Sequence, residues 1–75
     1  MEYELIREIF NRCANNQMRD VFVSDVETGN PEQYLKDFFG GREIAYEEDA
    51  REDGTRIFDV TVGNVRERFS FTPVR

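Results

Sequence analysis

The last third of the chain has the clearest alternation of apolar and polar residues. Two alternating runs, residues 56–62 and 65–72, flank Gly63-Asn64. Glycine at the first central position suits a two-residue type II′ turn, whose twist matches that of the flanking strands. The sequence therefore predicts a β-hairpin with a fixed register. Across it we expect the pairs Val62–Val65, Val60–Glu67, Thr61–Arg66, Asp59–Arg68, Phe58–Phe69 and Arg56–Phe71.

Residues 42–49 form a third alternating run, with Ile44 and Tyr46 on one side. A three-residue loop that ends at a left-handed Gly54 would pair Arg51 with Thr55 and bring Tyr46 opposite Val60, on the apolar face. A two-residue Asp53-Gly54 turn would put Tyr46 on the polar face instead, so burial favours the longer loop. The three runs predict an antiparallel meander.

The N-terminal segment is predicted as an amphipathic helix over residues 2–16. Tyr3, Ile6, Ile9 and Cys13 recur at three- and four-residue spacing, and Asn15-Asn16 suits a helix end.

A second helix is predicted after Thr28. Asn30 is a suitable N-cap, Pro31 fits the first helical position, and Gln33 stands where a capping box needs it. Gly40-Gly41 would end this helix.

Between the two helices, residues 20–28 read as a strand with imperfect alternation. Val21 and Val23 share one face, and Phe22 and Val26 share the other. Two explanations stay open: both faces are partly covered, or a bulge near Ser24-Asp25 exchanges the faces.

These elements predict a single α+β domain over residues 1–75, with the order α-β-α-β-β-β. We expect a two-layer sandwich in which two helices cover one face of a four-stranded mixed sheet. The strand at residues 20–28 would run parallel to an edge strand through a right-handed crossover. Which edge receives it is left open by the sequence.

Composition narrows the function classes. The chain carries 16 acidic and 10 basic residues, for a net charge of −6, which argues against direct nucleic-acid binding and against anionic membrane surfaces. No apolar run approaches the roughly 20 residues of a membrane span. The charged N-terminus lacks an apolar signal segment, and a single thiol suits a reducing compartment, so we expect a cytoplasmic protein.

Residues with catalytic or metal-binding chemistry are scarce. The sequence has no histidine and one cysteine, Cys13, which falls on the apolar stripe of the predicted helix and is interpreted as a core residue. Without histidine there is no Ser-His-Asp triad and little basis for a zinc site. We expect no catalytic residues, no metal and no cofactor.

The densest charged feature is an acidic stretch between residues 47 and 53. Its carboxylates are Glu47, Glu48, Asp49, Glu52 and Asp53. An EF-hand loop that began at Asp49 would place Arg51 at its third position and Val60 at its twelfth, so that motif is excluded. Three interpretations remain: a solvated loop, weak divalent-cation binding, or a contact surface for a basic partner.

Glu67 is the one residue that breaks the pattern, because the predicted register puts it on the apolar face opposite Val60. We expect its carboxylate to reach past the sheet margin or to pair with an arginine such as Arg42. A functional carboxylate at a partly covered site and a bulge that turns it outward are the alternatives.

The function that these observations favour is a small soluble intracellular protein, not an enzyme, that binds another protein. Free sheet edges can accept a partner strand, and a homodimer through such an edge is one version. The alternative is an acidic inhibitor or nucleic-acid mimic that occupies a basic groove on a nucleic-acid-processing protein. A third class, a small hydrolase or isomerase, would require a cleft around Glu67 or Tyr46.

Overall fold

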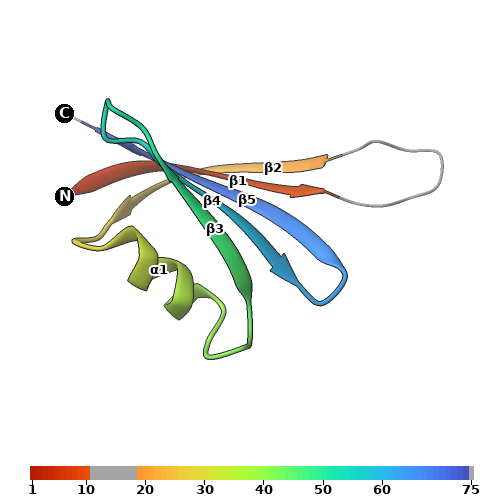
Figure 1. Cartoon of the computed structure of the whole chain (residues 1–75). Coiled ribbons are helices and arrows are strands. Elements are labelled where there is room, and N and C mark those ends of the chain that lie inside the picture. The colour runs from red at the N-terminus through yellow and green to blue at the C-terminus, as the bar shows by residue number, and fades with distance from the viewer. Residues whose placement is uncertain (11–18, 75) are drawn as a thin grey trace.

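Over the residues that the structure describes, the chain folds into a five-stranded antiparallel sheet with one short helix against one face (Figure 1). The computed structural model describes residues 1–10 and 19–74. The elements are β1 (Glu2–Phe10), β2 (Arg19–Glu27), α1 (Pro31–Phe38), β3 (Ala45–Ala50), β4 (Arg56–Val62) and β5 (Val65–Pro73). Their order across the sheet is β2-β1-β5-β4-β3, so the N-terminal hairpin is added beside the C-terminal meander.

The predicted meander of β3, β4 and β5 is confirmed in its register. Val62 lies opposite Val65 and Phe58 opposite Phe69, while Tyr46 lies opposite Val60. Gly63 has a φ of 59°, and Asn64 does not have a positive φ, which fits a type II′ turn. At the other connection the Arg51 N–H donates to the Thr55 carbonyl at 2.7 Å and Gly54 has a φ of 92°, as the longer loop requires.

The predicted helix over residues 2–16 is wrong, because residues 2–10 form β1 in the interior of the sheet. The same residues also alternate: Tyr3 and Leu5 are buried on one face while Glu2 and Glu4 are exposed on the other. Leu5 lies opposite the buried Phe71 of β5, a long-range partner that no local spacing could reveal. The parts of this prediction that concern Cys13 and Asn15-Asn16 lie outside the described residues.

The predicted four-stranded mixed sheet with two helices is also wrong, because the described part of the chain forms five strands, all antiparallel, and one helix. The strand predicted at residues 20–28 exists as β2, but it pairs with β1 as an antiparallel hairpin and makes no parallel crossover. The pairing is continuous from Glu2–Glu27 to Phe10–Arg19, so the proposed bulge near Ser24-Asp25 is absent. Because residues 2–10 form a strand, β1 can pair with the edge of β5 that faces away from β4.

The second predicted helix is confirmed as α1, with one change in its capping. The Asn30 side chain accepts from the backbone N–H groups of Glu32 (3.1 Å) and Gln33 (3.3 Å). The Gln33 side chain instead donates to Asp37 at 3.0 Å, and the Asn30 N–H donates to the Thr28 hydroxyl at 3.1 Å. Thr28 therefore takes the part that a capping box would give to Gln33.

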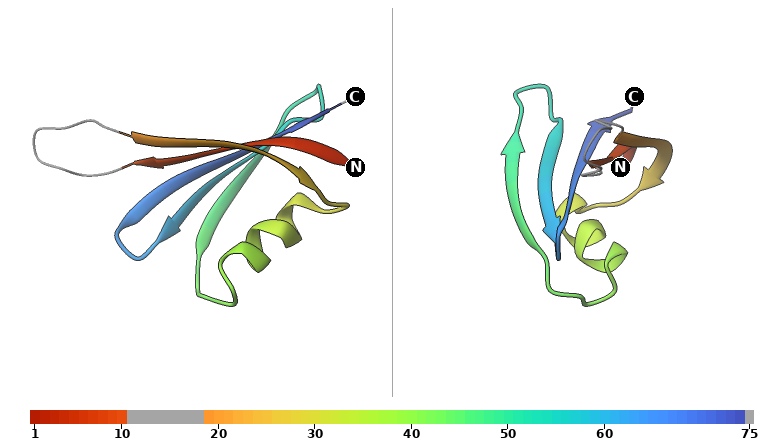
Figure 2. Two further views of the ribbon diagram at one scale, coloured as in Figure 1. Left: turned by 180° about the vertical axis from the view of Figure 1, so that it is seen from behind. Right: turned by 90° about the vertical axis from the view of Figure 1, so that its right-hand side faces the viewer.

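The core lies between α1 and the concave face of the sheet, which curves around the helix (Figure 2). Leu35 of α1 and Phe58, Phe69 and Phe71 of the sheet are completely buried. The Phe71 ring meets the rings of Tyr3, Tyr34 and Phe58 edge to face at centroid distances of 6.1, 5.7 and 5.8 Å. Phe71 thus joins β1, α1 and β4, three elements from separate parts of the chain.

Because Phe71 joins these elements, Phe71→Ala should lower the free energy of unfolding by about 3–5 kcal/mol. Denaturant titration followed by circular dichroism measures this change. Val74→Ala is the matched control, since Val74 is exposed just beyond β5 and its truncation should cost less than about 0.5 kcal/mol. Equal losses in the two variants would contradict the assignment of Phe71 to the core.

Candidate functional site

The acidic stretch does not form one surface, because β3 divides its carboxylates between two faces. Side chains alternate along a strand, so Glu47 and Asp49 lie on the outer face, away from α1, and Glu48 lies on the inner face. Glu48 forms an ion pair with Arg56, and Asp49 pairs with Arg51 at 3.2 Å. Two of the three strand carboxylates are therefore already neutralised within the chain.

Asp53 has a structural task in the β3–β4 loop. Its Oδ1 accepts from the Thr55 backbone N–H at 2.9 Å, which stabilises the tight turn at Gly54. This backbone hydrogen bond, reinforced by the Thr55 side chain, lowers the pKa of the Asp53 carboxyl below its ordinary value of 3.8. The stretch thus contains a turn-forming residue as well as the solvated ones.

The lowered pKa of Asp53 predicts a pH dependence of stability. A carboxyl whose pKa is depressed on folding stabilises the folded state above its unfolded pKa, and that contribution is lost as the pH falls through the folded value. Asp53→Asn keeps an oxygen acceptor for Thr55 but cannot titrate. Between pH 5 and pH 2 the unfolding midpoint of Asp53→Asn should therefore fall less steeply than that of the unsubstituted protein, as thermal denaturation would show. If the unfolding midpoints of the two proteins fell equally steeply with pH, the lowered pKa of Asp53 would be contradicted.

Glu67 lies on the inner face opposite Val60, as the register predicted, and only 6% of its surface is exposed. Its Oε1 accepts from Arg7 Nε at 2.7 Å. The expectation of an arginine partner is met by Arg7, whereas Arg42 only lines the same groove. The continuous pairing of β4 with β5 leaves no bulge that would turn Glu67 outward.

Arg7 is held by aromatic rings as well as by Glu67. Its guanidinium carbon lies 4.7 Å from the centroid of Phe38, 5.7 Å from that of Phe69 and 5.8 Å from that of Phe22. Such rings stabilise a cation through their negative faces. Sequence analysis missed this residue, because a helix over residues 2–16 offers no strand register that would bring Arg7 opposite Phe69 of β5.

The Arg7–Glu67 pair borders a groove of about 270 Å³ between the end of α1 and the turn of the β4–β5 hairpin. Its other lining residues are Phe38, Phe39, Arg42, Val62 and Val65. The buried carboxylate is already bonded to a guanidinium, so the arrangement is that of a structural ion pair on an otherwise apolar face.

We expect substitution of Arg7 and substitution of Glu67 to lower the free energy of unfolding by different amounts. Arg7→Met leaves a buried carboxylate without its partner and should cost about 3 kcal/mol of stability. Glu67→Gln leaves a guanidinium whose side chain is 27% exposed and can reach water, so about 1–2 kcal/mol is expected.

The double variant Arg7→Met/Glu67→Gln completes the double-mutant cycle. It should recover part of the loss of Arg7→Met, because no charge then remains buried. Chemical denaturation of all three proteins provides the comparison. Equal losses in the two single variants, with simple addition in the double variant, would contradict a coupled pair.

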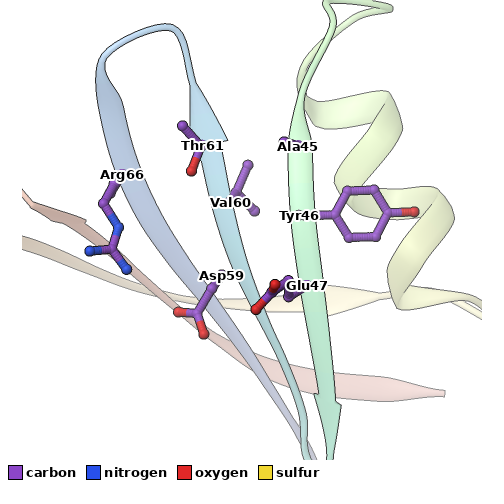
Figure 3. A pocket seen from close by; sticks show the side chains of 7 residues that line it. All are labelled: Ala45, Tyr46, Glu47, Asp59, Val60, Thr61 and Arg66. Carbon is purple, nitrogen blue, oxygen red and sulfur yellow. The ribbon is translucent and has the colours of Figure 1, made fainter.

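A second hollow lies on the outer face, across β3, β4 and β5 (Figure 3). Its volume is about 450 Å³, and Glu47 and Asp59 lie side by side in it, while the Tyr46 ring points the other way, toward α1. Asp59 Oδ1 accepts from Arg68 Nε at 2.9 Å. The remaining groups are solvated, and solvent screens charges on such a surface. This hollow therefore gives little basis for catalysis by a carboxylate pair.

The β1–β2 pairing also gathers carboxylates that the sequence keeps apart. Glu2 lies opposite Glu27 and Glu4 opposite Asp25, all on the outer face near the N-terminus. Like charges directly opposite one another destabilise a pair of strands. The N-terminal ammonium offsets part of this repulsion by an ion pair with Glu27 at 2.7 Å.

The two edges of the sheet differ strongly in character. β3, at one edge, carries Glu47, Glu48 and Asp49, and charged side chains of this kind discourage pairing with another strand. β2, at the other edge, carries Val21, Phe22 and Val23 in succession, and they are 52%, 53% and 64% exposed. Both faces of β2 are apolar there and largely exposed, with the Arg7 guanidinium against the Phe22 ring on the inner face. Partial cover of both faces and a bulge were the two explanations for the imperfect alternation of this strand. Neither explanation holds at the centre of β2.

Comparison with known proteins adds no functional assignment, because no family model, curated protein or solved structure matches the chain. Among the helices in the part of the chain that the structure describes, none is long and apolar enough to cross a membrane.

Proposed function

We propose that this protein is a non-enzymatic binding domain whose β2 edge accepts a strand from a partner chain. One observation carries the proposal: the apolar edge formed by Val21, Phe22 and Val23 is exposed, whereas the opposite edge is charged. A strand added to a sheet edge gains main-chain hydrogen bonds for affinity, and its alternate side chains give specificity.

The fold supports a binding role for this edge in a second way. β2 is fixed along its whole length by β1, which is itself paired with β5 in the middle of the sheet. A rigid edge loses little conformational entropy when a partner strand is added, which favours binding. We place the protein in the cytoplasm, where its single thiol would stay reduced.

The alternative of an acidic nucleic-acid mimic has weaker support from the geometry. A mimic presents carboxylates on one continuous surface to a basic groove, whereas Glu47 and Glu48 point to opposite faces of β3. Glu48 and Asp49 are also paired with arginines of the same chain.

Affinity capture from the lysate of the native host tests the proposed edge. The bait is the immobilised protein, compared with Val21→Lys/Val23→Lys, which puts two charges on the exposed edge. A partner that depends on strand addition should remain on the unsubstituted bait at high salt and be absent from the doubly substituted one.

Ala45→Lys is the matched control, since Ala45 is an exposed outer-face residue of the opposite edge strand. It should retain the partner. A partner held equally by all three baits would refute the role of β2. A partner released by salt alone would instead implicate the carboxylates.

A further inference from the structure

We propose that the strand that occupies the β2 edge is β2 of a second copy of this chain, paired antiparallel about a two-fold axis at Phe22. This inference rests on the proposed function and names the partner. The product would be a continuous ten-stranded sheet, formed from two five-stranded sheets joined edge to edge.

Hydrogen bonding to β1 determines which backbone groups of β2 face outward. The Thr28 N–H donates to the Met1 carbonyl at 3.1 Å, so the pair at positions 1 and 28 is hydrogen bonded. Hydrogen-bonded and non-hydrogen-bonded pairs alternate along an antiparallel ladder. The Ile6–Val23 and Glu8–Val21 pairs are therefore non-hydrogen-bonded, and the N–H and C=O groups of Val21 and Val23 point away from β1.

The ladder between β1 and β5 supports this assignment independently. The Val74 N–H donates to the Glu2 carbonyl at 2.9 Å, so Glu2 directs its backbone groups toward β5. Alternation then directs the groups of Tyr3 and the other odd-numbered residues of β1 toward β2, in agreement with the first ladder.

The outward-facing groups of Val21 and Val23 favour one register between the two copies. Antiparallel pairing about Phe22 puts Val21 opposite Val23 of the other copy and Phe22 opposite itself. Both valines have outward-facing backbone groups, so each Val21–Val23 pair exchanges both of its N–H···O bonds. Phe22 falls in a non-hydrogen-bonded pair, where side chains approach most closely and aromatic pairs contribute favourably.

Neighbouring registers match the edge less well. An axis at Val23 would put Val21 opposite Asp25 and Phe22 opposite Ser24, and an axis at Ser24 would put Val23 opposite Asp25. Only the axis at Phe22 places apolar residues opposite one another at all three exposed positions. In that register no carboxylate of β2 lies opposite another, and Asp20 faces Ser24.

The charged groups near the axis are compatible with this arrangement. The Arg7 guanidinium lies 5.8 Å from the Phe22 ring and is bonded to Glu67, so its charge is balanced within each copy. A single pair of strands buries less surface than the roughly 800 Å² per partner of a standard interface. The dimer should therefore be weak, with a dissociation constant in the micromolar range.

Sedimentation velocity from about 1 µM to about 1 mM tests self-association. The protein should pass from monomer to dimer as its concentration rises. Val23→Pro removes an outward N–H without breaking a bond to β1 and should raise the dissociation constant about tenfold or more. Val23→Ala, which keeps the N–H although it removes more apolar surface than proline does, is the control and should have a smaller effect.

Disulfide trapping tests the register. In a Cys13→Ser background, Phe22→Cys puts two thiols on the axis at a Cα separation of about 4.5 Å, which a disulfide can span. Ser24→Cys puts them about 13 Å apart along the strands. With oxidised glutathione as the acceptor of two electrons and two protons, the first variant should form a covalent dimer and the second should not.

The outcomes separate this inference from the proposed function. A chain that stays monomeric throughout, or a dimer unaffected by Val23→Pro, overturns the self-pairing. Equal trapping of the two cysteine variants overturns the register. If the self-pairing fails while Val21→Lys/Val23→Lys still abolishes capture of a different protein, the proposed function stands and only its partner changes.

Discussion

Pairing of β1 with β5 is the interaction on which the rest of this structure depends. β5 carries Phe69 and Phe71, both completely buried, and a strand between two neighbours is covered along both of its edges. β1 closes the second edge and brings Leu5 opposite Phe71 and Arg7 opposite Phe69. Without this pairing, the concave face that receives α1 would end at β5, and Leu35 would lack part of its cover.

The same pairing explains why a charged residue can lie on the apolar face. Glu67 belongs to β5, and β1 delivers the guanidinium of Arg7 to it at 2.7 Å. Three aromatic rings around Arg7 exclude water from one side of the pair while leaving the guanidinium partly exposed. A buried carboxylate without such a partner would be strongly unfavourable, so Glu67 and Arg7 are one structural unit contributed by two distant segments.

The two edges of the sheet differ in how far their side chains are exposed and in how much charge they carry. α1 is a short helix that covers the middle of the concave face, whereas β2 lies at the edge with both of its faces largely exposed at Val21, Phe22 and Val23. Natural sheets usually blunt such edges with charge, as β3 does here. One edge of this sheet is therefore charged and the other is apolar, and the proposed strand pairing depends on this difference.

The sequence by itself determined the elements whose signals are local. The Gly63-Asn64 turn set the register of β4 and β5, the loop ending at Gly54 set that of β3, and Asn30 with Pro31 marked the start of α1. Even the inward position of Glu67 followed from that register. Tertiary structure decided the secondary structure of residues 2–10. Tyr3, Ile6 and Ile9 follow a helical period, whereas Tyr3 and Leu5 follow a strand period equally well. Only the chance to pair with β5, more than fifty residues away, resolved this ambiguity in favour of a strand. With that choice came the partner of Glu67, the antiparallel place of β2 and the exposed edge, none of which a local pattern can encode.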